Sequence, residues 1–246
     1  MWIFAATLIT VLTAQENTID RAGRAAESFW GQFTAVQSKE RVTQTKVKAD
    51  GKILASQLEE FDYVSFLKAS NRGLMVEESR VSRSKAVKGA APFLITSGFP
   101  ALLLMFHPDF RDRFEFTEVP GIADPSTRRF AFKSKPETAS MSALKLQDHL
   151  YPILWKGAAT LDASSGAIRR IEADLAGSME DLGLSELHVE VDYGPAVLAG
   201  SREVFWLPAR ATISLKTPRQ AWRNVHEFSD YKKFSVTTST REGRPE

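Results

Sequence analysis

The sequence predicts an α+β protein that consists mainly of one large antiparallel β-sheet. The first supporting observation is the stretch Trp155–Leu175, in which two extended runs flank the turn-forming residues Asp162–Gly166. In the second run, Ile171, Ala173 and Leu175 alternate with charged residues, which is the period of a strand with one solvated face. The second observation is that several other segments repeat this alternation. Together they favour a sheet of many strands joined by short turns.

The composition is that of a globular protein and excludes several classes of function. Hydrophobic residues make up 43% of the 246 residues and charged residues 25%. The formal net charge of +2 argues against a dedicated nucleic-acid binder, which normally carries a strongly basic face. Because the chain has no cysteine, disulfides, cysteine nucleophiles and thiolate metal sites are excluded.

The N-terminus has the character of an export signal. Met1–Ala14 is an uncharged, largely apolar run of about the length of a signal-peptide core. We expect residues 1–14 to be a signal peptide and residues 15–246 to form a single domain, with a disordered tail from about residue 240. A buried first strand or helix is the alternative. The run is too short to cross a bilayer of ~30 Å as a helix, and we expect no transmembrane span.

Residues 17–34 are predicted to form an amphipathic helix packed on the sheet. Asn17 and Asp20 resemble a helix N-cap pair. Five apolar residues fall on one face at helical spacing: Ile19, Ala22, Ala26, Phe29 and Phe33. A membrane-surface helix fits less well, because Asp20 and Glu27 lie on the polar face.

The residues after this helix predict a meander of about four strands between positions 36 and 82. Val36–Lys48 and Lys52–Phe61 flank a turn at residues 49–51, and Leu74–Val81 follows a second turn. Later strands are predicted at residues 113–119, 128–133, 187–193, 209–215 and 225–238. In the last of these, Phe228, Tyr231 and Phe234 are spaced by three, which predicts a bulge.

The most apolar interior stretch, Phe93–Phe110, predicts a short helix that begins near Pro100 and stops at Pro108. Its apolar face would carry Phe99, Leu102, Leu103 and Phe106. The segment is either a plug in the core or the lid or wall of a hydrophobic cavity.

Large side chains are more numerous than a thin sheet with one helix layer needs. They include Trp30, Phe61, Phe66, Phe93, Trp155, Phe205 and Trp206. They either form a generous core or line a cavity for an acyl chain, where burial contributes ~0.8 kcal/mol per methylene. The candidate cavity residues are Phe99, Leu102, Leu103, Phe106, Trp155 and Trp206.

The sequence shows no catalytic or cofactor motif. His188 and Glu190 share a strand face, but such a pair is not a metal site. Nucleophile elbows and glycine-rich phosphate loops are absent. The acidic pairs Glu59-Glu60 and Glu77-Glu78 are interpreted as solvated strand edges, because neighbours along a strand point to opposite faces. We therefore expect no enzyme activity, no cofactor and no metal.

The C-terminal run TPRQAWRNVHEFSDYKKFSV interleaves basic and aromatic residues, which is a pattern of some single-strand nucleic-acid binders. Glu227 and Asp230 interrupt it, and its ring spacing fits a core-facing strand. The sequence therefore predicts no nucleic-acid partner.

The order of these segments resembles the lipoprotein-carrier fold of outer-membrane lipoprotein-sorting proteins. The order is export signal, helix, antiparallel meander, apolar insertion, "LDASSG" hairpin and further strands. The hairpin WKGAATLDASSGAIRRIEADL resembles the strand–Asp–turn–strand unit of that family, and Phe205–Pro208 is similar to its late strands. The segments TSGFPALLLMFHP and TPRQAWRNVHEFSDYKKFSV also look like those of exported proteins from Acidobacteria-type soil bacteria.

This resemblance implies an incomplete, half-closed β-barrel wrapped around the N-terminal helix and the apolar insertion. It implies a periplasmic, non-catalytic carrier or sensor in the cell envelope that binds a lipid, an acyl chain or a lipoprotein. Two alternatives remain open. One is a protein-interaction or stress-sensing module of the envelope on the same fold, without bound lipid. The other is a hydrolase on an unrelated β scaffold, which would need a convergent polar pocket.

Overall fold

The computed structural model describes residues 18–28, 30, 35–48, 50–70, 73–83, 98–120, 124–146, 149–198 and 204–233. The expected signal peptide, the expected tail and Phe29, Phe33 and Phe93 lie outside these residues. The elements, in chain order, are an N-terminal helix (residues 18–28 and 30), β1 (Ala35–Lys48), β2 (Ile53–Ser70), β3 (Gly73–Ser82), η1 (Ala101–Phe106), α2 (Pro108–Arg111), β4 (Phe114–Val119), β5 (Thr127–Ser134), β6 (Ser142–Leu146), β7 (His149–Ile153), β8 (Trp155–Asp162), β9 (Ile168–Leu175), η2 (Glu180–Leu182), β10 (Glu186–Val197), β11 (Val204–Lys216) and β12 (Gln220–Lys233).

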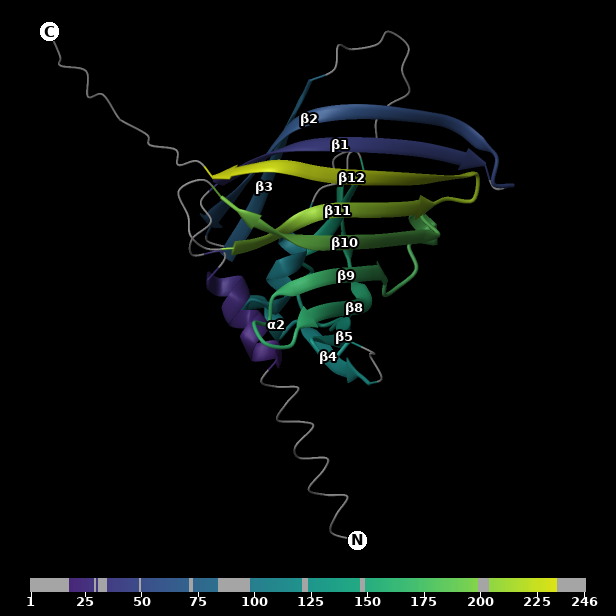
Figure 1. Cartoon of the computed structure of the whole chain (residues 1–246). Helices are drawn as coiled ribbons and strands as arrows, with labels where there is room; N and C mark the ends of the chain where they lie inside the picture. Colours follow the sequence, from purple (N-terminus) through teal and green to yellow (C-terminus); the bar gives the residue numbers. More distant parts are fainter. Residues whose placement is uncertain are drawn as a thin grey trace, which may run out of the picture.

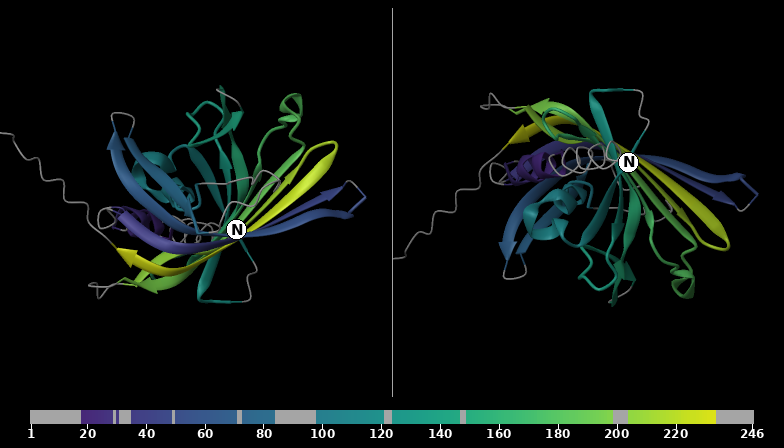
Figure 2. Two further views of the ribbon diagram at one scale, coloured as in Figure 1. Left: turned by 90° about the horizontal axis from the view of Figure 1, so that it is seen from above. Right: turned by 90° about the horizontal axis from the view of Figure 1, so that it is seen from below.

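One antiparallel sheet organises the molecule, as the alternating segments predict. Among the described residues it has ten strands, ordered β3-β2-β1-β12-β11-β10-β9-β8-β5-β4, and β6 and β7 form a separate two-stranded ribbon. The outermost strands, β3 and β4, do not pair with each other, so the sheet formed by the described residues is open rather than a closed barrel. Figures 1 and 2 show it strongly twisted and curved, with the N-terminal helix and η1 on its inner side. The predicted α+β half-barrel is therefore confirmed.

The core lies between the curved sheet and these two helical segments. The N-terminal helix buries Ile19, Ala22 and Ala26, while Arg24 and Glu27 on its other side are exposed. This is the amphipathic pattern that the spacing predicts. Figure 1 shows the helix, drawn in purple, beside the teal η1 and α2 segment.

The described part of the apolar insertion is buried most completely in η1. η1 is a 3-10 helix, and Leu102, Leu103, Leu104, Met105 and Phe106 are all buried. The four residues of the predicted apolar face, Phe99, Leu102, Leu103 and Phe106, are all buried. Leu104 and Met105 are buried as well, because the segment packs between the sheet and the N-terminal helix. Each such side chain contributes about 1.5–3 kcal/mol on burial, so η1 acts largely as a core plug.

As predicted, the helix that begins near Pro100 ends before Pro108, and Pro108 also begins a second helix. Instead of only ending a helix, it occupies the first turn of α2, where its missing N–H costs nothing. His107 caps this helix by accepting a hydrogen bond from the Asp109 N–H.

In the part of the chain that the structure describes, the N-terminal meander contains three strands rather than about four. β2 runs without interruption from Ile53 to Ser70, because no turn residue separates the predicted return run from the following FDYVSFLKAS. The predicted bulge in the last strand is confirmed. Between β1 and β12 the register shifts after Gln37, and Asp230 adopts a φ of 54° there.

Candidate functional site

The β8–β9 turn is shaped by Asp162 and packs closely on the N-terminal helix. The Asp162 carboxylate accepts hydrogen bonds from the backbone N–H groups of Ser164 and Ser165, at 3.1 and 2.9 Å. Gly166 follows with a φ of +74°, and a Cβ at this position would lie 2.6 Å from the Ala22 nitrogen. Only glycine therefore lets the turn approach the helix this closely.

Further contacts hold the helix in place. Arg21 donates a hydrogen bond to the Ala163 carbonyl at 2.9 Å, on the same turn. Asp20 forms an ion pair with Arg111 of α2. A Cβ on Gly23 would lie 3.0 Å from the Phe106 carbonyl oxygen, so the helix also packs tightly on the backbone of η1. The helix is thus clamped between the turn and η1.

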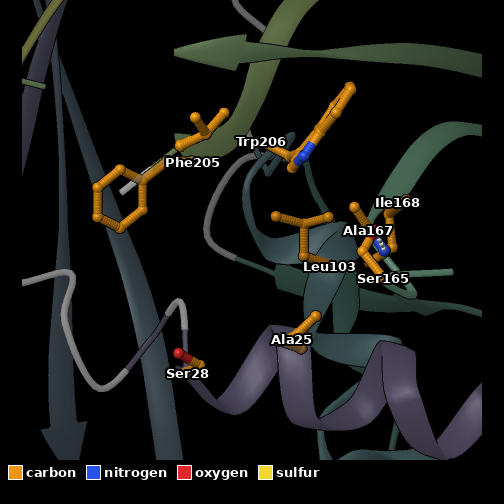
Figure 3. Close-up of a pocket in the computed structure, with 10 residues that line it drawn as sticks. Ala25, Ser28, Leu103, Ser165, Ala167, Ile168, Phe205 and Trp206 are labelled. Atoms are coloured by element: carbon orange, nitrogen blue, oxygen red, sulfur yellow. Dashed lines mark hydrogen bonds between the residues drawn. The ribbon is translucent and has the colours of Figure 1, made fainter. Parts of the chain in front are cut away.

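An apolar pocket of about 250 Å³ lies beside this clamp. Its walls come from the N-terminal helix, η1, the β8–β9 turn and the start of β11 (Figure 3). Its lining residues are Ala25, Ala26, Ser28, Leu103, Ser165, Ala167, Ile168, Val204, Phe205 and Trp206. Only Ser28 and Ser165 among them carry a polar side chain, so the pocket suits an apolar group.

The charged side chains at the rim of the pocket pair with each other. The Arg169 guanidinium lies 3.9 Å from the centroid of the Trp206 ring and donates a hydrogen bond to Asp162 at 2.5 Å. Hydrogen bonds from Ser164, and then from Arg169, hold the pKa of Asp162 well below its usual range. Beside these groups Val204 is 54% exposed, and Val197, its strand partner, 68%. The mouth therefore continues onto an exposed aliphatic edge.

The structure brings together two of the six predicted cavity residues. Leu103 and Trp206 line the pocket (Figure 3). Phe99, Leu102 and Phe106 belong to the core, where the Phe99 ring packs on His226 and the Phe106 ring on Phe116. Trp155 begins β8 and borders a separate hollow of about 10 Å³. Ligand contact by any of the six stays a prediction.

The pocket is smaller than most ligand sites. Clefts that bind drug-sized molecules measure about 300–1,000 Å³. The pocket, at about 250 Å³, holds only part of a lipid unless a wall moves. Among its walls, Leu103 is 4% exposed and belongs to the plug, whereas Val204 is open to solvent.

A buried charged cluster lies elsewhere in the core and is formed by side chains of β1, β3 and β12. Arg80 donates hydrogen bonds to both carboxylate oxygens of Glu40, at 2.5 and 3.0 Å. The His226 Nδ1 lies 2.7 Å from Glu40 Oε1. Glu78 Oε2 lies 3.7 Å from Arg80. With both carboxyl groups ionised and one guanidinium present, the cluster would carry one net negative charge. Burying an unpaired charge is costly.

The protonation of the cluster follows from this arrangement. Burial raises the pKa of the Glu78 carboxyl. Burial likewise lowers the pKa of His226, which favours the neutral imidazole with Nδ1–H donating to Glu40. Burial also acts on Glu40, but hydrogen bonds from His226 and Arg80 outweigh it and lower its pKa.

Glu78 of this cluster and Tyr193 of β10 hold the residues just before η1. The Gly98 N–H donates to Glu78 Oε1 at 2.8 Å, and Tyr193 Oη–H donates to the Phe99 carbonyl at 2.9 Å. The interpretation of Glu77-Glu78 as a solvated edge is therefore wrong for Glu78, whose side chain is 4% exposed. Sequence reasoning missed the cluster because its members come from distant strands. The only local signal was an acidic residue at an inward-facing position of β3.

His188 and Glu190 do lie on one face, as their spacing predicts. His188 contacts Asp174 at 2.6 Å and Glu190 at 3.1 Å. Arg170 adds hydrogen bonds to Asp192 and Glu190, at 2.7 and 2.8 Å. These groups form a ladder of ion pairs across β9 and β10. Among the described residues no cluster of three or more His, Asp or Glu side chains suits a metal ion.

Comparisons with known proteins found structural likeness only. No family model matches the chain, and no curated protein matches it. One similar solved structure is a domain assigned to the outer-membrane lipoprotein-sorting proteins from Vibrio parahaemolyticus. The match has 9% identity and a TM-score of 0.43, and it covers 91% of this chain and 94% of that domain. Identity and TM-score are both low, so this likeness carries no argument about the role of the chain. Within the described residues, none of the helices is sufficiently long and apolar to span a bilayer.

Proposed function

We propose that the protein is a non-catalytic carrier or sensor that binds a hydrophobic ligand in the pocket beside the N-terminal helix. The ligand class is a lipid, a free acyl chain or the acyl chain of a lipoprotein. The proposal also places residues 1–14 as a cleaved export signal and residues 15–246 as one domain in the periplasm, in keeping with the uncharged apolar run Met1–Ala14.

The observation that carries the proposal is the lining of the pocket. Eight of its ten lining residues are apolar, and Val204 leads from the pocket to solvent. Apolar burial of this kind is non-directional and proportional to area, which suits a methylene chain. The Ser165 hydroxyl donates to Asp162 at 2.9 Å, so it is engaged in the turn rather than poised as a nucleophile.

A second candidate is a protein-interaction module without bound lipid. The observation in its favour is that η1 is buried in the core, and the apolar pocket beside it measures only about 250 Å³. Several large aliphatic residues are also exposed elsewhere, as interaction surfaces require, including Ile53, Leu58 and Val81.

The test is native mass spectrometry of the protein recovered from periplasm, followed by uptake of a fluorescent fatty acid. Ala25→Phe would fill the pocket from the helix without placing a charge in the core, and we expect it to reduce uptake at least about tenfold. Ala143→Phe, at an exposed position of β6, is the matched control and should bind like the wild type. The intact mass should correspond to a chain that begins after Ala14.

The carrier proposal fails if the wild type is recovered without ligand and takes up no fatty acid. It also fails if Ala25→Phe and Ala143→Phe bind the fatty acid equally well, since the chain would then bind elsewhere. In either case the interaction module becomes the better description.

A further inference from the structure

The residues just before η1 lie directly against two ionisable side chains of the buried cluster. The Gly98 N–H donates to Glu78 Oε1 at 2.8 Å, and the centroid of the Phe99 ring lies 4.9 Å from that of the His226 ring. The Leu102 N–H donates to the Gly98 carbonyl at 3.1 Å, so η1 continues directly from these contacts. A change in the cluster therefore acts on the start of η1.

The cluster is neutral when Glu78 and His226 hold one proton between them. Arg80 and Glu40 cancel each other's charge, because the guanidinium donates to both carboxylate oxygens at 2.5 and 3.0 Å. Of the remaining two groups, burial raises the pKa of Glu78 and lowers the pKa of His226. The proton is therefore bound by Glu78, and His226 is neutral.

The other titratable groups near the cluster are three buried tyrosines. They are Tyr63 of β2, Tyr193 of β10 and Tyr231 of β12, and burial raises the pKa of each well above its ordinary value. Their hydroxyl groups therefore keep their protons across the range from acid to mildly alkaline pH. Among these described groups, a change in pH acts on Glu78 and His226.

Neither of these two groups has a partner for a changed charge. Glu78 Oε2 and His226 Nε2 are buried, and neither forms a hydrogen bond within the described residues. If Glu78 loses its proton, its Oε2 lies 3.7 Å from Arg80, which is longer than a hydrogen bond. If His226 gains a proton, its Nε2–H has no acceptor. Either change leaves an uncompensated charge in the core, which is costly.

We propose that the cluster is a proton-controlled anchor for η1, which is closed when Glu78 and His226 hold one proton between them and opens when they gain a second proton or lose the first. Opening separates Gly98 from Glu78 and Phe99 from His226, and water then reaches the uncompensated charge. On each side the opening equilibrium changes by at most about tenfold per pH unit, because one proton is involved.

The direction on each side follows from the state that binds the proton more tightly. The lowered pKa of His226 means that the open state binds more protons below about pH 6.5, so acid favours opening. The raised pKa of Glu78 means that the closed state binds more protons above about pH 4.5, so alkali also favours opening. The closed state is therefore most populated between these two limits.

Hydrogen exchange tests the anchor without any ligand. The amides of Leu102, Leu103 and His107 are hydrogen-bonded within this segment, so their protection factors report opening of η1. Glu78→Gln keeps this position neutral at every pH. The ratio of its protection to that of the wild type should therefore rise at least about tenfold from pH 5 to pH 8.

His226→Gln tests the acid side. Gln cannot gain a proton, so the ratio of its protection to that of the wild type should rise at least about fivefold from pH 7 to pH 5. The wild type alone gives the same information should a variant fail to fold. Its η1 amides should be less protected at pH 4 and at pH 8 than at pH 6, while the amides of β9 stay protected.

The controls are Glu180→Gln and His149→Gln, which change an exposed carboxyl group and an exposed imidazole. Their ratios should not depend on pH. A pH-independent ratio for Glu78→Gln or for His226→Gln would overturn the proposal. So would equal changes in the amides of η1 and β9, because the cluster would then act on the whole fold rather than on η1.

The consequence for ligand binding rests on the proposed function. Leu103 of η1 lines the pocket, so opening of the anchor displaces one of its walls. The Kd of a fluorescent fatty acid should then change between pH 6 and pH 8 in the wild type and stay constant in Glu78→Gln. If no fatty acid binds at any pH, the proposed function fails, and the exchange measurements still decide whether the anchor exists.

Discussion

Single residues at close contacts set the geometry of the pocket. Gly166 and Gly183 both have a φ near +75°, yet their surroundings differ. A Cβ on Gly166 would meet the backbone of Arg21 and Ala22 at 2.6 Å, whereas one on Gly183 has nothing within 4 Å. The contact between turn and helix, rather than the turn alone, therefore requires glycine at position 166.

This difference yields a prediction for two alanine variants. Gly183→Ala should lower the free energy of unfolding only by the cost of placing alanine in a left-handed backbone conformation, about 1 kcal/mol. Gly166→Ala adds a steric overlap with the helix and should lose clearly more, about 3 kcal/mol. Urea unfolding of the two variants measures this. Equal losses would mean that the helix moves away freely and is not clamped by the turn.

Among the elements, strands were predictable and the apolar insertion was only partly so. The alternation of apolar and polar residues predicted the hairpin of β8 and β9 and the strands β10 to β12. A strand with one solvated face shows this alternation in its own sequence. The length of β2 was missed, since no turn residue marks where a long strand ends. The ribbon of β6 and β7 was also missed, because its short strands carry little alternation.

The candidate site shows the same limit. Leu103 and Trp206 were predicted from their size and apolar character, and both line the pocket. Ala25, Ser165 and Ala167 were not predicted, because small residues line a pocket only through the packing of distant elements. Glu40, Glu78 and His226 were missed for a similar reason, as strand pairing brings together residues that sequence spacing cannot relate.

The anchoring of η1 gives a prediction at this scale. Tyr193→Phe removes the hydrogen bond to the Phe99 carbonyl and leaves a buried acceptor unpaired, at a cost of about 1–3 kcal/mol. Hydrogen exchange at the amides of residues 102–107 should become faster. Tyr231→Phe, which removes a bond to the Pro208 carbonyl, is the control and should leave these amides unchanged. Similar protection in both variants would show that Tyr193 does not hold η1.

For the whole molecule, the buried charged cluster links stability to pH. The pKa of His226 is lower in the folded state than in the unfolded chain, so the unfolded chain binds more protons below about pH 6.5. The stability that neutral His226 contributes to the folded state is therefore present at pH 7 and is lost as the pH falls. The raised pKa of Glu78 acts in the opposite direction above about pH 4.5, and a variant of His226 alone is needed to separate them.

We expect His226→Gln to destabilise the protein more at pH 7 than at pH 5. The difference in the free energy of unfolding between the wild type and the variant should change by up to about 1.4 kcal/mol per pH unit, because one proton is involved. Gln retains an N–H donor for Glu40, which limits the disruption. Urea unfolding at both pH values measures the effect. A destabilisation that does not depend on pH would show that His226 does not titrate between the folded and unfolded states.

The pairing of β1 with β12 governs the order in which the fold is built. The hydrogen bond between Glu40 and His226 joins residues 186 positions apart, and this ladder lies within the sheet rather than at its edge. Such remote contacts form late, because the entropy of closing a long loop must be overcome first. During synthesis, β1 to β3 emerge early but have no sheet to join until β12 follows. The part of the sheet formed by β1 to β3 therefore joins the part formed by β4 to β11 only when β12 pairs with both β1 and β11.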